Sequence, residues 1–374
     1  MKHQFLKTGA VLFLSFSAAL AADLPARNTA ASYVGFASCS STSCHGGASD
    51  NKNQCIVWSR LDFHSRSFAT LNSARSERLS EVLKINKAST SERCTVCHAP
   101  FQSIPDKLLK PGIERDHGVS CEICHAPAQN WLRSHTRADF TRKDRAADGM
   151  ADLQDFYVRA NTCVACHQVV DKELLAAGHP ELIFEMDGQS VTEPRHWKEK
   201  DPAFRAKGWA VAQAVALREI RTQLASDPAP SESLVAKWNG LSWLLQKISS
   251  QPVTPHQASL AKPTKEAIET TLKTADDFAR AYAEKQLSSQ DTKTLLAGLL
   301  ATSSDFGNSA VPQKIQARRA ERLVLGIDRL TAGLSEAELK TLNPKIQSLF
   351  KQVQSLPDFQ PTAFGKTLDS LTQK

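Results

Sequence analysis

Cys94-Thr-Val-Cys97-His98, Cys121-Glu-Ile-Cys124-His125 and Cys163-Val-Ala-Cys166-His167 repeat one pattern, Cys-x-x-Cys-His. One more copy, Cys39-Ser-Ser-Thr-Ser-Cys44-His45, has four residues between its cysteines instead of two. Numbered in chain order, this is the first motif, and the motifs that begin at Cys94, Cys121 and Cys163 are the second, third and fourth. At such spacings two thiols can reach the two vinyl groups on one edge of a porphyrin, and the following histidine turns under the ring to ligate iron. The pattern therefore predicts four covalently attached c-type haems, which would organise the fold of the segment around them.

Two other chemistries use paired cysteines. A zinc site does not require a histidine directly after every second cysteine, and thioredoxin-like redox pairs do not occur in fours, so haem attachment is favoured. The predicted attachment residues are Cys39, Cys44, Cys94, Cys97, Cys121, Cys124, Cys163 and Cys166. The predicted iron ligands on the attachment side are His45, His98, His125 and His167.

Each haem iron has a second axial position, and the same stretch holds four spare histidines. They are His64, His117, His135 and His179. Because neutral imidazole is a common iron ligand, we predict that these four fill the second positions. His117 lies so close to Cys121 that we expect it to ligate a neighbouring haem. We expect His196 and His256 not to be ligands.

The N-terminal sequence has the pattern of an export signal. Lys2 and Lys7 precede an apolar run from Val11 to Leu20, and Ala19-Leu20-Ala21 offers the small residues of a cleavage site. Residues 1–21 are therefore predicted to be a signal peptide, with an uncleaved anchor as the alternative. The mature chain would be periplasmic or extracellular. No later stretch is apolar over the length that a membrane helix needs.

Cysteine content and charge both divide the mature chain. All nine cysteines precede Gln168. Acidic and basic side chains balance over residues 22–200, so the formal net charge of +7 comes mainly from residues 201–374. The propionates of four haems would make the first part acidic, which makes nucleic acid an unlikely partner. We predict a tetrahaem domain over 22–200 and a haem-free domain over 201–374.

The fold is predicted to be mostly α-helical. Residues 22–200 are poor in strand signals and combine long loops with short helices, such as Ser76–Ile85. In such a segment porphyrins can take the place of a missing apolar core. After residue 201, apolar side chains recur at helical spacing. The predicted tail helices cover 209–224, 234–245, 267–282, 292–301, 315–330 and 339–353, with breaks at 226–231 and 251–263.

These tail segments predict five to seven amphipathic helices in an antiparallel bundle. The bundle could cap the haem domain, dock a partner or form an oligomer. Simple structural packing is the favoured interpretation.

Several short motifs in the sequence resemble those of a known protein family. They are Cys39-x4-Cys44-His-Gly, Trp58 followed by Asp62-x-His64, His117-Gly-Val-x-Cys-Glu-x-Cys-His125, Gly178-His179-Pro and Arg195-His196-Trp197. Over residues 33–225 the chain resembles the multihaem c-type cytochromes related to the tetrahaem cytochrome c that accepts electrons from hydroxylamine oxidoreductase. The resemblance implies closely packed haem pairs and mostly bis-histidine irons, and it supports the ligands named above. In that family one iron can keep an open position.

Two features depart from the family. Cys55 is a ninth cysteine, and in an oxidising compartment a lone thiol requires an explanation. It is either buried as a small apolar group or paired in a disulfide with Cys39, which would leave the first haem attached through Cys44 alone. The cysteine-free tail is the second departure.

Two functions fit these predictions. The favoured one is a periplasmic electron carrier, without catalytic residues, that relays single electrons between a donor and an acceptor redox protein. The alternative is a multihaem oxidoreductase that acts on a small nitrogen or sulfur compound at one five-coordinate haem. It would need one idle spare histidine and a proton donor nearby, for which Tyr157 and Arg159 are candidates.

Overall fold

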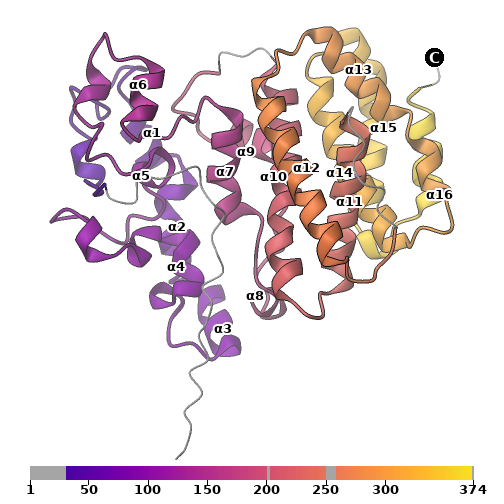
Figure 1. Ribbon diagram of the computed structural model, residues 1–374, viewed down its shortest axis with the longest axis horizontal. Helices are drawn as coiled ribbons and strands as arrows, with labels where there is room; N and C mark the ends of the chain where they lie inside the picture. Colours follow the sequence, from indigo (N-terminus) through magenta and orange to yellow (C-terminus); the bar gives the residue numbers. More distant parts are fainter. Residues whose placement is uncertain (1–30, 200–202, 250–257, 373–374) are drawn as a thin grey trace, which may run out of the picture.

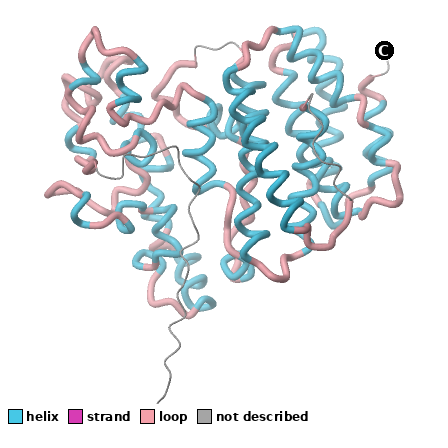
Figure 2. The backbone as a smooth tube through the Cα atoms, viewed as in Figure 1, coloured by secondary structure: helices cyan, strands magenta, loops and turns pink. Residues whose placement is uncertain are grey.

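The computed structural model describes residues 31–199, 203–249 and 258–372. It is 63% helical and has no strand within these ranges, which confirms the predicted mostly α fold. A single parallel bridge joins Tyr33 to Leu109. Figure 2 shows short helices and long loops in the N-terminal part and long, close-packed helices in the C-terminal part. The predicted signal peptide and His256 lie outside the described residues.

The N-terminal part contains nine α-helices within the described ranges. They are α1 (Gln54–Arg60), α2 (Ser67–Thr70), α3 (Ala74–Leu83), α4 (Glu92–His98), α5 (Cys121–His125), α6 (Arg142–Ala147), α7 (Phe156–His167), α8 (Lys172–Ala176) and α9 (Met186–Thr192). Short 3-10 helices lie at Phe36–Ser38, Phe63–Arg66, Ala88–Thr90, Pro100–Ser103, Asp106–Leu108 and Ser134–Thr136. The longest of these helices, α7, has 12 residues, and isolated helices shorter than roughly 12–15 residues are marginal in water, so their stability must come from what they pack against.

Seven α-helices follow in the C-terminal part. They are α10 (Phe204–Ser226), α11 (Glu232–Ile248), α12 (Lys265–Glu284), α13 (Ser289–Leu300), α14 (Gln313–Thr331), α15 (Glu336–Val353) and α16 (Pro361–Asp369), with 3-10 turns at Ser303–Phe306 and Leu356–Asp358. Local sequence starts several of them: Ser288 and Ser335 each form a capping box, with Asp291 and Glu338 respectively. All six predicted tail segments lie on helices, as predicted.

Helix α10 differs from the amphipathic prediction because it is buried on every side. Eight consecutive residues, Ala210–Leu217, are shielded from solvent, including the polar Gln213. Helices α7, α9, α11, α12 and α14 all pack against it. A helix that is apolar all round belongs inside a bundle, and α10 is the centre of this one.

The apolar core continues from the N-terminal part into the bundle. Phe156 and Val164 on α7 belong to the same buried cluster as Trp209 on α10. The Tyr157 hydroxyl also donates to Asp276 on α12, over 2.6 Å. Figure 1 shows α7 and α9 between the loop-rich region and the long helices. Helix α7, which carries the motif Cys163–His167, therefore packs against the bundle.

Candidate functional site

One large cavity dominates the N-terminal part. Its volume is about 2260 Å³, well above the roughly 300–1,000 Å³ of a pocket for one small ligand. All eight predicted attachment cysteines and their four histidines line it. Residues of α10, among them Lys207 and Gln223, form part of its wall. The four motifs are therefore brought to one shared space large enough for several cofactors.

Local helix geometry directs each regular motif into this cavity. The motifs at Cys94–His98, Cys121–His125 and Cys163–His167 each form the last turn of a helix, α4, α5 and α7. Positions i, i+3 and i+4 of a helix lie on one face, so both cysteines and the histidine point the same way. The first motif lies in turns instead, because its two extra residues break this register.

Three pairs of histidine rings face each other across the cavity. The ring centres of His45 and His135 lie 6.2 Å apart. Those of His64 and His167 lie 6.0 Å apart, and those of His125 and His196 lie 6.3 Å apart.

These separations are slightly shorter than those of two imidazoles that hold one metal between them. A metal–imidazole bond is about 2.0–2.1 Å long and the nitrogen lies about 1.2 Å from the ring centre, so the two ring centres would be about 6.4–6.6 Å apart. The residues present therefore fit iron between paired histidines.

A fourth pair is formed by His98 and His179. Both line the cavity, and the two rings are close enough for charge on His179 to affect the titration of His98. Burial is the main cause that lowers the pKa of His98, and the charge on His179 adds to it. Thus three of the motif histidines face another histidine ring, and charge on His179 acts on the fourth, His98.

His196 is a site residue that we predicted not to be a ligand. It lines the cavity, and its Nδ1 is buried without a hydrogen-bond partner among the described residues. Periodicity and spacing give no signal for it, because it lies 17 residues beyond His179 and far from any cysteine. The only sequence signal was the phrase Arg195-His196-Trp197 in the family resemblance.

His117 is placed differently from the other three predicted distal histidines. It is absent from the cavity lining, whereas His64, His135 and His179 are part of it. Its ring packs edge-on against Phe36 and Trp58, and its Nε2 forms an ion pair with Glu114. The structure therefore gives His117 protein partners outside the cavity, whereas His196 faces His125 within it.

Burial favours the neutral form of His98, His125 and His167 by lowering the pKa of each. It lowers the pKa of His125 and of His167 to about 4, and it lowers that of His196 as well. Neutral imidazole is the form that ligates metals. His64 is the exception, because hydrogen bonding to Asp62 and then Glu193 raises its pKa to about 10.

The attachment cysteines of different motifs contact one another. The thiols of Cys39 and Cys121 form a hydrogen bond, as do those of Cys97 and Cys166. The first motif therefore lies beside the third, and the second beside the fourth.

Cys55 is buried on α1 beside Cys121, to whose thiol it is hydrogen-bonded. All nine cysteines are free thiols in the structure, including Cys39 and Cys55. Burial is what the interpretation of Cys55 as a small apolar group requires, and charge on Cys39 also acts on the Cys55 thiol, as proximity of the two cysteines requires.

Glu122, between the two cysteines of the third motif, has a structural role that sequence reasoning missed. Its buried carboxylate accepts hydrogen bonds from the backbone N–H groups of Val34, Gly35 and Ala128, at 2.7–3.0 Å. Burial raises its pKa, and these bonds offset part of that cost. Glu122 thus fastens the N-terminal segment to the third motif.

The two proton-donor candidates of the enzyme alternative have separate locations. Arg159 lines the cavity and forms an ion pair with Glu199 over 2.6 Å. Tyr157 is absent from the lining and donates its hydroxyl to Asp276 instead. Only Arg159 faces the shared space.

Comparison with known proteins identifies the class. Residues 38–126 match the sequence model of a family, over less than half of the chain. This segment is therefore similar to c-type cytochromes, and the similarity supports covalently attached haem and an electron carrier with redox partners. The matching family is described as cytochrome c554 and c-prime, and the match confirms the predicted cytochrome family. No curated protein and no solved structure matches the chain.

The bundle helices are not candidates for membrane spans. None of the helices within the described ranges is both long enough and apolar enough to cross a bilayer.

Proposed function

We propose that this protein is an exported tetrahaem cytochrome that relays single electrons through four bis-histidine haems. Each proposed haem is attached through one motif and ligated by that motif's histidine and a facing one. The proposed ligand pairs are His45 with His135, His98 with His179, His125 with His196, and His167 with His64.

The observation that carries this proposal is the spacing of the histidine rings. Three pairs lie 6.0–6.3 Å apart. Each pair joins one motif histidine to one histidine from outside the motifs, and all six rings line the cavity, a selection that unrelated ring packing would not make. The common cavity and its eight cysteines support the same conclusion.

The contacts between motifs support a continuous relay. Cys39 lies against Cys121, and Cys97 lies against Cys166. Charge on Cys124 also acts on Cys166, which links the third motif to the fourth. The proposed order is therefore motif one, three, four and two, with every step between adjacent groups.

The protein's own groups position and insulate these centres. When bound, haem supplies an iron that takes up and releases one electron at a time. The paired histidines would hold the iron from its two sides, and apolar residues such as Leu79 and Val164, which line the cavity, would exclude water from it. Arg75, Arg145 and Lys207 line the cavity and provide positive charge for the propionates.

A carrier is favoured over an enzyme because three motif histidines face another imidazole and the fourth, His98, has His179 close enough for its charge to act there. With both axial positions filled, an iron offers no site for a substrate. Export to the periplasm or beyond is part of the proposal, since this family is typically secreted or periplasmic. A donor and an acceptor protein complete the pathway, and the helical tail, 201–374, is proposed to support the fourth motif.

The test is the visible spectrum of the purified, dithionite-reduced protein with and without carbon monoxide, together with a haem-to-protein ratio. We expect four haems per chain and no change on adding carbon monoxide, because bis-histidine iron has no open position.

A carbon monoxide response from about one haem in four would contradict the carrier proposal. The oxidoreductase alternative would then be tested with nitrite, nitric oxide, hydroxylamine and sulfur oxyanions. Absence of c-type bands would overturn the haem assignment itself.

A further inference from the structure

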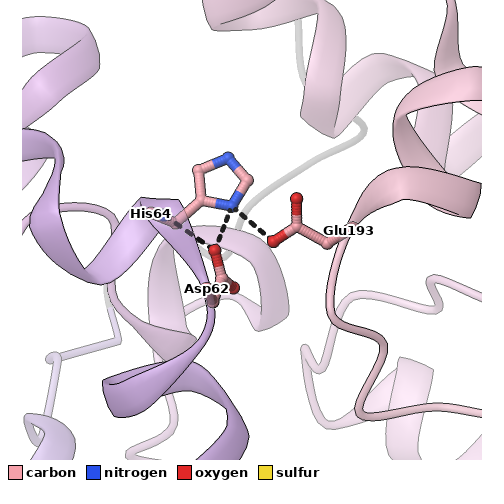
Figure 3. Close-up of side chains that lie close together, drawn as sticks. All are labelled: Asp62, His64 and Glu193. Carbon is pink, nitrogen blue, oxygen red and sulfur yellow. Dashed lines mark hydrogen bonds and ion pairs between the residues drawn. The ribbon is translucent and has the colours of Figure 1, made fainter.

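His64 is flanked by two carboxylates (Figure 3). Its Nδ1 lies 3.1 Å from Oδ1 of Asp62 and 3.3 Å from Oε1 of Glu193. Asp62 is only 4% exposed, and Glu193 reaches the ring from the end of α9, 129 residues further along the chain. In Figure 3 the other ring nitrogen of His64 points away from both carboxylates. That nitrogen is the one free to ligate iron.

Within the part of the chain that the structure describes, no carboxylate is hydrogen-bonded to Nδ1 of the other seven proposed ligands. Four have neutral oxygen partners: His45 has Gln54, His98 has the Ser67 carbonyl and Thr70, His135 has the Trp131 carbonyl, and His179 has the Pro180 carbonyl. His167 contacts the Gln189 amide at 3.3 Å. Nδ1 of His125 and of His196 is buried with no hydrogen-bond partner within the described ranges.

This difference has a predictable electronic effect. A ligating histidine that donates its second N–H to a carboxylate becomes a more basic ligand. A stronger donor, with negative charge beside it, favours the more positive ferric iron over the ferrous one, and hydrogen bonding around axial ligands is one of the ways in which proteins tune haem. The reduction potential should therefore fall at the iron between His64 and His167.

The backbone makes this arrangement rigid. Asp62 also accepts a hydrogen bond from the backbone N–H of His64, over 2.7 Å, which fixes the carboxylate beside the ring. The carbonyl of His64 accepts from the N–H of Val119 at 2.9 Å and from the Ser67 hydroxyl at 2.8 Å. The imidazole cannot easily turn away from its anionic partners.

We propose that Asp62 and Glu193 are positioning residues that give the haem between His64 and His167 the lowest reduction potential of the four. The inference rests on the proposed function, since it requires that His64 ligates iron. One electron enters this haem from a reduced redox protein or a neighbouring haem and leaves to an oxidised one. In the proposed order this is the third centre, so the carboxylates place an uphill step inside the relay.

The test is a redox titration of the haem-loaded Glu193→Gln protein, followed by visible and electron paramagnetic resonance spectra. Glutamine keeps the shape and an acceptor oxygen but removes the charge. We expect the lowest-potential component to become about tenfold easier to reduce at a given applied potential, which is about 59 mV for one electron. The other three components should keep their potentials.

A second variant identifies the component. His64→Met should raise the potential of the same haem further, because a thioether ligand favours ferrous iron. If Glu193→Gln and His64→Met change the reduction potentials of different components of the titration, the proposal is wrong.

Two matched variants separate the hydrogen bond from general charge. Asp152→Asn removes a carboxylate that lines the cavity and pairs with Arg142 but touches none of the ligands. It should therefore leave the reduction potential of the lowest-potential component unchanged. Gln54→Glu puts a carboxylate on Nδ1 of His45 and should lower the potential of a different component. An equal shift in Asp152→Asn and Glu193→Gln would overturn the proposal.

Carbon monoxide distinguishes failure of this inference from failure of the proposed function. Suppose that Glu193→Gln binds four haems, shows no spectral change with carbon monoxide and has the same four reduction potentials as the wild type. The tuning proposal then fails, while bis-histidine ligation stands. A carbon monoxide response in the wild type would instead contradict the ligation on which the inference rests.

Discussion

His196 and His117 provide the sharpest contrast at the scale of single residues. His196 faces His125 in the cavity, whereas His117 packs against Phe36 and Trp58 outside its lining. Both are partly buried imidazoles in the same part of the chain, so each variant is a control for the other.

We expect His196→Ala to open one iron and His117→Ala to open none. Reduced His196→Ala should bind carbon monoxide at about one haem in four, while reduced His117→Ala should keep the wild-type spectrum. The measurement is the carbon monoxide difference spectrum of each variant at equal haem content. The reverse pattern would return the fourth distal position to His117.

At the scale of elements, the crossing of α10 and α14 depends on a glycine. Gly326 on α14 lies against the indole of Trp209, and a Cβ there would overlap the ring. Trp209 is completely buried, so neither side can move without disturbing the centre of the bundle. Gly298 on α13 is exposed, and a Cβ there would meet nothing within 4 Å.

Alanine at these two glycines should have opposite effects on stability. Gly326→Ala should destabilise the protein by about 1–3 kcal/mol through overpacking. Gly298→Ala should stabilise it by about 0.5–1 kcal/mol, because alanine loses less backbone entropy in a helix. Urea unfolding followed by circular dichroism measures both. If Gly326→Ala were as stable as Gly298→Ala, the tight crossing would be excluded.

At the scale of the whole molecule, a buried carboxylate lies where the haem region meets the bundle. Glu185, just before α9, is 8% exposed, accepts a hydrogen bond from Gln213 on α10 at 2.6 Å and lies 3.8 Å from Arg322 on α14. Burial and then the charge of Asp187 raise its pKa to about 7. In the unfolded chain the pKa of a glutamate is about 4.3.

The stability of the protein should therefore fall as the pH rises through this interval. Between about pH 4.3 and 7 the folded state binds more protons at Glu185 than the unfolded chain does, so the free energy of unfolding decreases with pH. One unit of pKa shift corresponds to about 1.4 kcal/mol, which gives a loss of up to about 4 kcal/mol over the whole interval. Glu185→Gln lacks this titration.

Unfolding in urea at pH 5 and pH 7.5 checks the expectation. The wild type should lose more stability than Glu185→Gln between the two values, and the exposed Glu269→Gln should behave as the wild type does. An identical loss in wild type and Glu185→Gln would mean that Glu185 is already ionised in the folded protein at pH 5.

The sequence by itself determined the chemistry of attachment and the helices. Cys-x-x-Cys-His is a local pattern, because two thioethers and a proximal ligand come from one helical turn. Helical periodicity and capping residues are local as well, so the tail helices were predictable. The family match over residues 38–126 confirms the cytochrome assignment.

Only the tertiary structure decided which histidines face each other. A facing ligand can come from any distance along the chain, so spare histidines can be counted from the sequence but cannot be paired or ranked. Thus His196 faces His125 although 71 residues separate them, and Glu193 reaches His64 from α9. The burial of α10 on every side is equally non-local, since it depends on helices that pack around it from both parts of the chain.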